Sequence, residues 1–171
     1  MKHDHADEVI ARWRVEMPQL PELPLQIAKR TARLCAMLDA QSISELSKLE
    51  LTRAEYGVLA TLRRVGAPYR LKPSDLTAAA VLSTGGTSNV IRRMEQAGYV
   101  RRHEDPQDGR SSWVELTARG VKIAELAVQN SVQAHAKLLS VVPDGKAEAL
   151  NNLLRQVLVL LGDRAKPPSQ L

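Results

Sequence analysis

Hydrophobic residues recur along most of this chain at the three- and four-residue spacing of amphipathic helices. The spacing predicts a helix over residues 6–17, a longer one over 25–48, and another that begins with a capping box at residues 52–55. A further long helix is expected to reach Val142, and a last one follows with Asp144 as its cap. These patterns predict a mainly helical protein.

Residues 82–117 depart from this regular helical pattern. Residues 84–97 predict a short helix, and two strands are expected over 99–103 and 112–116 with a charged hairpin tip between them. Pro73 opens another short helix just before this stretch. A helix pair followed by a β-hairpin is a winged helix-turn-helix. The predicted fold class is therefore mainly α with a small β-wing.

The helix over residues 84–97 has one packing face and one polar face. At about 100° per residue, its hydrophobic side chains, among them Val90, Ile91 and Met94, fall together on one side. The opposite side carries Ser, Asn and Arg, which are residue types that hydrogen-bond base edges in the major groove of DNA. A solvated helix surface is the alternative, and the hairpin that follows favours DNA recognition.

The hairpin supplies a second expected DNA contact. Arg110 stands at its tip, and Asp108 lies two residues earlier, where its carboxylate would hold the guanidinium in a fixed direction. An arginine so placed can enter a narrow minor groove, where the negative potential is enhanced. The alternative for this segment is a solvated surface turn.

Backbone and hydroxyl groups complete the predicted DNA-binding surface. Ser83 would cap the short helix, Gly85 would let its backbone approach a phosphate, and Ser74 lies in the first turn of the preceding helix, where a phosphate could bind. The residues predicted to contact DNA are Ser74, Ser83, Thr84, Gly85, Thr87, Ser88, Asn89, Arg92, Arg93, Asp108 and Arg110.

The block from Leu51 to Gly120 resembles the multiple antibiotic resistance regulator (MarR) family of bacterial transcription factors. The resemblance rests on the order of its helices, the Asp108-Gly109-Arg110 motif of the wing, and the Leu-Thr-x-x-Gly segment that ends at Gly120. It implies a homodimer that binds double-stranded DNA at a pseudo-palindromic operator, usually as a repressor released by a small molecule. The alternative is a winged-helix module for protein interaction, which would have no need of Arg92 and Arg93.

The chain divides into four predicted parts. They are N-terminal helices in residues 1–50, a DNA-binding domain in 51–117, C-terminal dimerisation helices in 118–162, and a disordered tail in 163–171. The N-terminal part holds an extra helix and a dimerisation helix. The C-terminal helices carry a wide seam of Leu and Val, more apolar surface than a small domain needs for its own core, so a second copy is expected to cover it.

Composition sets outer limits on these predictions. The 171 residues carry a net charge of +5, 44% hydrophobic residues and no Phe, which favours an aliphatic helical interior and is compatible with nucleic acid. The single cysteine, Cys35, excludes an internal disulfide and suits a reducing compartment. The longest apolar run is far shorter than the roughly 18 residues of a membrane-spanning helix. A cytoplasmic protein without a membrane partner is therefore expected.

Other chemistry finds no supporting pattern. No nucleophile with a base, phosphate loop or cysteine–histidine cluster has the necessary context, so neither an enzyme nor a cofactor is predicted. No metal site is predicted, because His3 and His5 fit a frayed terminus better. Cys35, among leucines, is expected to be a buried inert thiol, and His135 is expected to be a core or interface residue.

The extra N-terminal helix and the segment 66–76 resemble a MarR subgroup that includes urate-responsive regulators. In that subgroup a Trp, an acid and an Arg form the ligand pocket. Trp13 is retained here, whereas the other two positions fall on Gly57 and Val90. A buried urate anion would lack its charge partner, which is costly. A more apolar or aromatic effector near Trp13, Gly57 and Val90 is therefore expected, and a plain core role for Trp13 is the alternative.

Overall fold

The computed structural model describes residues 3–79, 84–105 and 108–163. In chain order its elements are α1 (His5–Glu16), α2 (Glu22–Ser47), α3 (Arg53–Arg64), β1 (Arg70–Leu71), α4 (Pro73–Ala79), α5 (Thr84–Gln96), β2 (Val100–Asp105), β3 (Asp108–Leu116), α6 (Ala118–Leu139) and α7 (Asp144–Leu160). The strands form one antiparallel sheet in the order β1-β3-β2. Helices with a small three-stranded sheet confirm the predicted fold class.

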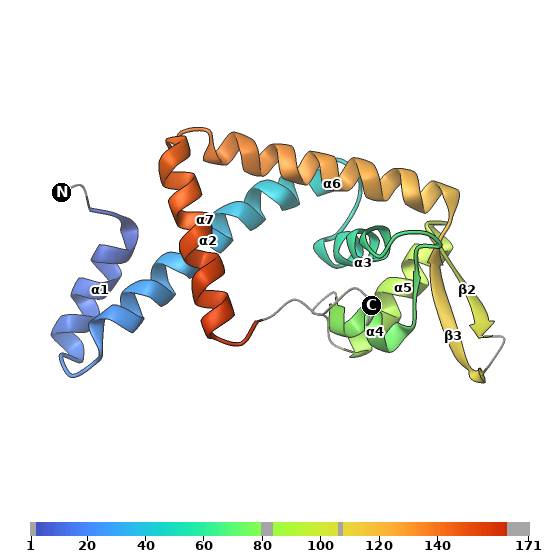
Figure 1. Cartoon of the computed structure of the whole chain (residues 1–171), viewed down its shortest axis with the longest axis horizontal. Helices are drawn as coiled ribbons and strands as arrows, with labels where there is room; N and C mark the ends of the chain where they lie inside the picture. Colours follow the sequence, from blue (N-terminus) through green and yellow to red (C-terminus); the bar gives the residue numbers. More distant parts are fainter. Residues whose placement is uncertain (1–2, 80–83, 106–107, 164–171) are drawn as a thin grey trace.

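The two longest helices, α2 and α6, pack against each other and form the body of the molecule (Figure 1). The winged-helix domain (residues 51–117) gathers α3, α4, α5 and the hairpin of β2 and β3 at one end of this body. At the other end, α1 packs on the first half of α2, and α7 turns back from the end of α6. The length of α2 therefore separates α1 from the winged-helix domain.

Capping side chains fix where the helices begin. Thr52 Oγ1 accepts a hydrogen bond from the Glu55 N–H at 3.2 Å, and Glu55 Oε2 accepts one from the Thr52 N–H at 2.8 Å, which confirms the predicted capping box. Thr117 likewise caps α6. The predicted cap of α7 is wrong, because Pro143 holds the cap position and Asp144 is the first helical residue. There its carboxylate instead complements the positive end of the helix dipole.

Several boundaries differ from the prediction, and α2 begins at Glu22 rather than at Leu25. α6 ends at Leu139 rather than Val142, whose N–H donates to the Leu139 carbonyl at 2.9 Å in the closing turn. β2 and β3 extend to Asp105 and Asp108, so much of the predicted hairpin tip is paired strand. The two-residue strand β1 was not predicted, since two residues are too few to show an alternating pattern.

One hydrophobic core joins the winged-helix domain to its flanking helices. Its buried members are Leu46, Leu51, Val58, Leu59, Leu62, Leu76, Ile91, Met94, Val100, Val114, Leu116, Ala124 and Ala127. Val58 and Leu62 of α3 are buried, and the predicted packing face of α5 is confirmed at Ile91 and Met94. In α4, Leu76 is buried and Ala79 is exposed, while Ala80 lies outside the described residues. Leu46 and Ala124 lie outside residues 51–117, so the core extends into α2 and α6.

Two glycines place the wing against the helices. Gly98, at φ +71°, follows α5 in a left-handed conformation that favours glycine. At Gly120, an added Cβ would lie 1.9 Å from the Tyr99 carbonyl oxygen, so any other residue would push α6 away from the start of β2. The close approach of α6 to the sheet explains the glycine that ends the Leu-Thr-x-x-Gly segment.

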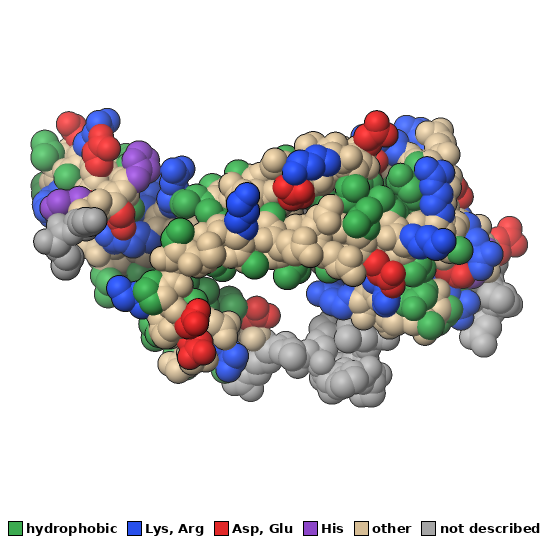
Figure 2. Space-filling view, turned by 90° about the horizontal axis from the view of Figure 1, so that it is seen from above, with side chains coloured by type: hydrophobic (Ala, Val, Ile, Leu, Met, Phe, Trp, Pro, Cys, Tyr) green, Lys and Arg blue, Asp and Glu red, His purple; other side chains and the backbone are tan. Residues whose placement is uncertain are grey.

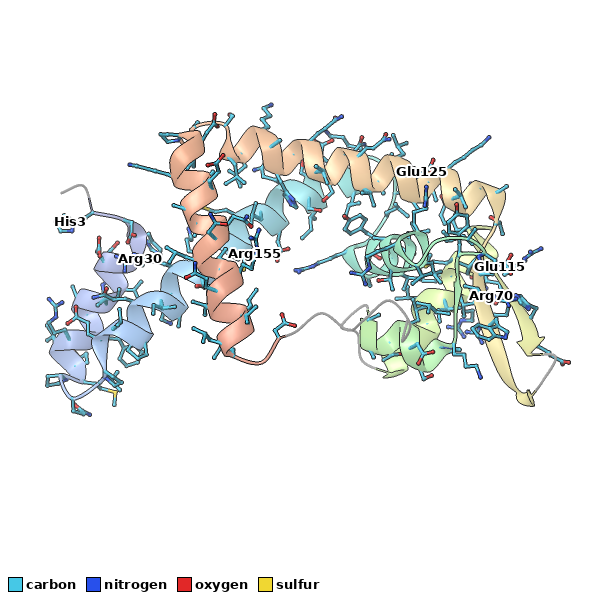
Figure 3. The ribbon with its side chains drawn as sticks, in the orientation of Figure 1. His3, Arg30, Arg70, Glu115, Glu125 and Arg155 are labelled. Carbon is cyan, nitrogen blue, oxygen red and sulfur yellow. The ribbon has the colours of Figure 1, made fainter. Side chains whose placement is uncertain are left out.

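The N-terminal helices are joined by packing and by charge. α1 buries Ala6 and Ile10 against α2. Arg30 of α2 donates to Asp4 at 2.8 Å and to Asp7 at 2.5 Å, and it lies between the two helices in Figure 3. α1 therefore docks on α2 through a small apolar contact bordered by an ion-pair cluster.

The C-terminal helices leave much apolar surface uncovered in the single chain. None of the residues that make up α7 is buried, and hydrophobic side chains reach the surface over α6 and α7 (Figure 2). On α6 the buried stripe is Ala124, Ala127 and Ser131, whereas the predicted stripe residue Val132 is exposed. Within the described ranges, no helix is both long and apolar enough to cross a membrane. Of the predicted tail, the structure describes Asp163 alone.

Candidate nucleic-acid interface

The polar face of α5 is held outward by the packing of its other face. Ile91 and Met94 are fully buried against the core. The residues on the opposite side of α5 therefore face away from the core. Ser88, Asn89 and Arg92 are exposed, as predicted. The Arg92 guanidinium donates to Asn89 Oδ1 at 3.2 Å, which aligns the two side chains one turn apart on the same surface.

This face of α5 meets the wing in a hollow that the sequence analysis did not predict in full. Ser88, Asn89, Arg92, Glu95 and Arg102 line it. Arg102 belongs to β2, where it lies opposite Val114 and so on the side of the sheet turned toward the core. Its backbone N–H donates to Glu95 Oε1 at 3.3 Å, and its guanidinium lies 3.9 Å from Glu95 Oε2. The hollow therefore presents both donors and acceptors.

Glu95 and Arg102 were missed for different reasons. Glu95 lies three residues after Arg92 and shares its helix face, so periodicity alone could have found it. Arg102 needed the register of β2 on β3, which pairs it with Val114 and turns it toward α5. Asparagine, arginine and glutamate can recognise adenine, guanine and cytosine respectively in a major groove. The hollow thus has the chemistry to distinguish base pairs.

The side chain of Thr87 does not lie on this surface. It is 2% exposed, because it precedes Ile91 by four residues and falls on the packing face of α5. The predicted DNA contact from this side chain is corrected accordingly. Ser74 is exposed on α4, as a phosphate contact requires. Ser83 lies outside the described residues, and only the backbone of Thr84 and Gly85 is described.

Arg93 of α5 forms an ion pair with α3. Its guanidinium lies 3.2 Å from Glu55 Oε1, and the Glu55 residue is 7% exposed. The other carboxylate oxygen of Glu55 belongs to the capping box with Thr52. One nearly buried carboxylate thus holds both the start of α3 and the last turn of α5, so Arg93 fixes α5 against α3.

The wing carries its charges on two faces. The side chains of the predicted tip residues Asp108 and Arg110 lie outside the described part, although their backbone belongs to β3. On the outer face, Glu115 accepts hydrogen bonds from Arg101 at 2.5 Å and His103 at 2.8 Å. Desolvation would raise the pKa of Glu115, but the hydrogen bonds from Arg101 and His103 outweigh it and lower the pKa. Glu115 is therefore ionised near neutral pH.

The three predicted effector residues do not meet within the single chain. Trp13 lines a small hollow with Ile10, Met17 and Leu25 at the α1 end of the molecule. Gly57 and Val90 are half-buried in α3 and α5 at the opposite end (Figure 1).

A different cavity lies between α2, α3 and α6. Its volume is about 330 Å³, and its lining residues are Cys35, Leu38, Asp39, Ser42, Ile43, Arg53, Tyr56, Ser131 and His135. Cys35 is exposed, so the prediction of a buried thiol is wrong: α2 turns this side chain away from the core and into the cavity. His135 is half-buried on α6, where it faces the same cavity. Among the described residues, no cluster of His, Cys, Asp or Glu is arranged to hold a metal ion.

Comparisons with known proteins agree with this geometry. The model of the MarR family matches residues 49–111. The HTH-type transcriptional regulator PecS of Dickeya dadantii is 31% identical over 150 residues, which cover 88% of this chain and 90% of that protein. The fold is similar to that of AbsC, a MarR family transcriptional regulator from Streptomyces coelicolor, with a TM-score of 0.70, 24% identity, and coverage of 85% of this chain and 99% of that one. A mutant MarR from E. coli complexed with operator DNA gives a TM-score of 0.68 at 24% identity, covering 85% and 97% of the two chains.

Proposed function

The chain belongs to the MarR family of DNA-binding transcriptional regulators, and we propose that it recognises its operator through the exposed face of α5. Its partners are double-stranded DNA and a second copy of itself. The observation that carries the assignment of the surface is the hollow in which Ser88, Asn89 and Arg92 of α5 meet Arg102 of β2. Helix, wing and basic side chains converge there, as recognition in a major groove requires.

Within this surface we assign base recognition to Asn89, Arg92 and Glu95. A good contact of this kind contributes about 1–3 kcal/mol of discrimination against the wrong base. Ser74 and the basic residues of the wing bind phosphates, which fix the position of the protein without specifying sequence. Arg110 enters the minor groove beside the recognition helix.

A two-fold dimer places two such surfaces on one duplex. The operator is therefore expected to be pseudo-palindromic, with half-sites about one helical turn, roughly 10 bp, apart. The exposed leucines and valines of α7 support a dimer held by the C-terminal helices together with α2. We further propose that the dimer represses transcription, and that it works in the cytoplasm, where the operator lies. Members of the family are transcriptional regulators rather than enzymes.

We also propose that a small apolar or aromatic molecule releases the dimer from DNA. The cavity of about 330 Å³ beside Tyr56 is large enough for such a ligand and opens on α3. Arg53 and Tyr56 of that cavity flank Glu55, which holds Arg93 of the recognition helix. A ligand that shifts the start of α3 would therefore displace α5.

Urate is not expected to act as the effector, since Gly57 and Val90 supply no charge for its anion. The test is a titration of urate and of phenolic compounds against the operator complex, followed by DNA binding and Trp fluorescence. Release by micromolar urate would overturn this part of the proposal.

The DNA-binding assignment is tested by selecting operator sequences from a random duplex library with wild type and variants. Arg92→Ala and Asn89→Ala are expected to lose preference at defined base pairs. Gln96→Ala, an exposed residue of the same helix outside the hollow, is the matched control and should leave the preference unchanged. A wild-type protein that selects no sequence would favour the protein-interaction alternative.

A further inference from the structure

Two polar side chains on the exposed face of α5 are hydrogen-bonded to each other. The Arg92 guanidinium donates to Asn89 Oδ1 at 3.2 Å. The two residues lie three positions apart, so they are neighbours on the helix surface. Ile91 and Met94 are buried and hold the opposite side of α5 against the core. Asn89 and Arg92 therefore face outward as a connected pair.

The hydrogen bond fixes the direction of the Asn89 side chain. A guanidinium can only donate, so it meets the carboxamide oxygen and not the carboxamide nitrogen. The oxygen has a second lone pair, and the nitrogen keeps both of its hydrogens. The carboxamide can therefore still accept one hydrogen bond and donate another. Adenine presents the complementary groups in the major groove, where N6 donates and N7 accepts.

Arg92 keeps enough donors for a second partner. A guanidinium carries five N–H donors in a planar fork, and the bond to Asn89 uses one of them. The commonest specific partner of arginine in the major groove is guanine, whose O6 and N7 both accept. The bond to Asn89 also restricts the rotation of a long side chain in advance, so less conformational entropy is lost when guanine is bound.

The carboxylate of the same hollow is engaged with another element. Glu95 lies three residues after Arg92 and could compete with Asn89 for its guanidinium. Glu95 instead accepts from the Arg102 N–H at 3.3 Å, and the Arg102 guanidinium lies 3.9 Å away. The hollow thus holds one pair within α5 and one pair between α5 and β2. Because Asn89 is uncharged, it does not neutralise the charge that Arg92 presents to DNA.

The spacing of Asn89 and Arg92 suits two neighbouring base pairs. Three residues of an α-helix rise about 4.5 Å, and successive base pairs of B-DNA lie about 3.4 Å apart. A recognition helix in the major groove can therefore place the two side chains against adjacent bases. The hydrogen bond keeps the two side chains together, which favours two purines stacked on one strand.

We propose that Asn89 and Arg92 recognise an adenine and a guanine, adjacent on one strand of the operator, as a coupled unit. The proposal rests on the DNA-binding function above and names the bases that this pair selects. Loss of Asn89 would release the Arg92 guanidinium, and loss of Arg92 would let the Asn89 carboxamide rotate. Each side chain therefore contributes to the preference at both positions, whereas independent side chains would each affect one position.

The test uses the full-length protein and the operator selected from the random library, with the two positions replaced by every pair of bases. Wild type is expected to prefer adenine and guanine there, each by about 5- to 100-fold. Asn89→Ala should lose the adenine preference and also reduce the guanine preference by about two- to tenfold, which corresponds to one hydrogen bond. Asn89→Asp keeps an oxygen for Arg92 but loses the donor to adenine N7, so its guanine preference should survive.

Two measurements control for indirect effects. Gln96→Ala, on an exposed residue of α5 outside the hollow, should keep both preferences. The slope of log affinity against log salt concentration (the salt slope) distinguishes a base contact from a phosphate contact, because each phosphate neutralised contributes about 0.9 to it. Asn89→Ala removes no charge, so its salt slope should equal that of wild type. Circular dichroism of each variant establishes that it is folded.

Full retention of the guanine preference in folded Asn89→Ala would overturn the coupling. Selected operators without an adjacent adenine and guanine would overturn the assignment of the bases. If Arg92→Ala keeps the guanine preference and lowers the salt slope by about one unit on every duplex, Arg92 binds a phosphate and the proposal is wrong. These outcomes leave the DNA-binding function intact. A wild-type protein that selects no sequence would overturn the function and the coupled pair together.

Discussion

The winged-helix domain and the C-terminal helix α7 bury apolar side chains in different ways. In the domain, α3, α5 and the sheet enclose residues such as Val58, Leu62 and Met94 within one chain. On α7, Leu153 and Leu158 remain exposed although their helical spacing is as regular as that of core positions. The first region is stabilised by its own chain, whereas we propose that the exposed face of the second packs on a second copy.

We infer from this difference that DNA recognition and dimerisation depend on separate sets of contacts. The side chains that line the recognition hollow come from α5 and β2, far from α7 along the chain. A change on α7 should therefore alter the number of recognition surfaces in each complex without altering any one of them.

Removal of residues 145–171 is expected to leave a folded monomer. Loss of the second recognition surface should lower affinity for the full operator by about 10²–10⁴, because simultaneous binding of two half-sites is lost. Sedimentation gives the molecular mass, and a DNA titration gives the affinity. A truncated protein that remains dimeric would show that α7 does not hold the dimer.

A pair of point variants tests whether α7 holds the dimer without shortening the chain. Leu154 lies on the predicted apolar seam of α7, whereas Leu160 lies off it and is 85% exposed. Leu154→Asp should dissociate the dimer, since it buries an unpaired charge at the interface. Leu160→Asp is the matched control and should leave the dimer intact. Equal behaviour of the two variants would contradict the assignment of the seam.

Leu62→Ala tests whether the core of the winged-helix domain is stabilised by its own chain. Leu62 is fully buried in the core of the winged-helix domain, so the substitution should lower the free energy of unfolding by about 2–5 kcal/mol. Urea unfolding, followed by circular dichroism at several protein concentrations, measures this loss separately from dissociation. A loss below about 1 kcal/mol would mean that the domain does not close its own core.

Glu55→Gln is expected to weaken operator binding by about two- to fivefold, as the loss of a partly exposed ion pair below about 1 kcal/mol implies. Gln can maintain the capping box with Thr52 but cannot balance the charge of Arg93. The salt slope should stay constant, because Arg93 holds α5 in place rather than a phosphate. A steeper slope and tighter binding would show instead that Glu55 keeps Arg93 away from DNA.

Acid is expected to loosen α1 from α2. The pKa of Asp4 is lowered chiefly by the hydrogen bond from Arg30, and that of Asp7 chiefly by its backbone hydrogen bond with Asp4. Lowered carboxyl pKa values stabilise the folded state above the ordinary value of about 3.9, and this contribution is lost as the pH falls below it.

Trp13 lies on α1, so its fluorescence should report the change in an acid titration of wild type. Trp113→Phe keeps an aromatic ring in the wing and removes the second Trp from the signal. Arg30→Gln should reduce the dependence on pH. An identical titration in the variant would show that Arg30 does not anchor the helix.

Local sequence signals predicted much of the fold. The capping box of Thr52 and Glu55 acts within four residues, so the sequence contains the whole interaction. The packing face of α5 was found in the same way. Thr87 lies on the same face by its spacing. Because its side chain is polar, it was predicted to contact DNA instead.

Features made by distant segments could not be found this way. Arg102 joins the recognition hollow through the register of β2 on β3, and Arg70 reaches Trp113 through a strand of two residues. The exposure of Cys35 depends on how α2 lies against α3 and α6, which its leucine neighbours do not determine. Such contacts need the tertiary arrangement, because no local period encodes them.

The hydrogen bond between Ser42 and Ser131 sets a limit on how α2 and α6 can slide. The two hydroxyl oxygens lie 2.8 Å apart, and both residues are buried. A shift of α2 along α6 by one turn would break this hydrogen bond. Each buried hydroxyl left without a partner would then cost about 1–3 kcal/mol. The pair therefore fixes the register of α2 along α6, and with it the length of the body that separates α1 from the winged-helix domain.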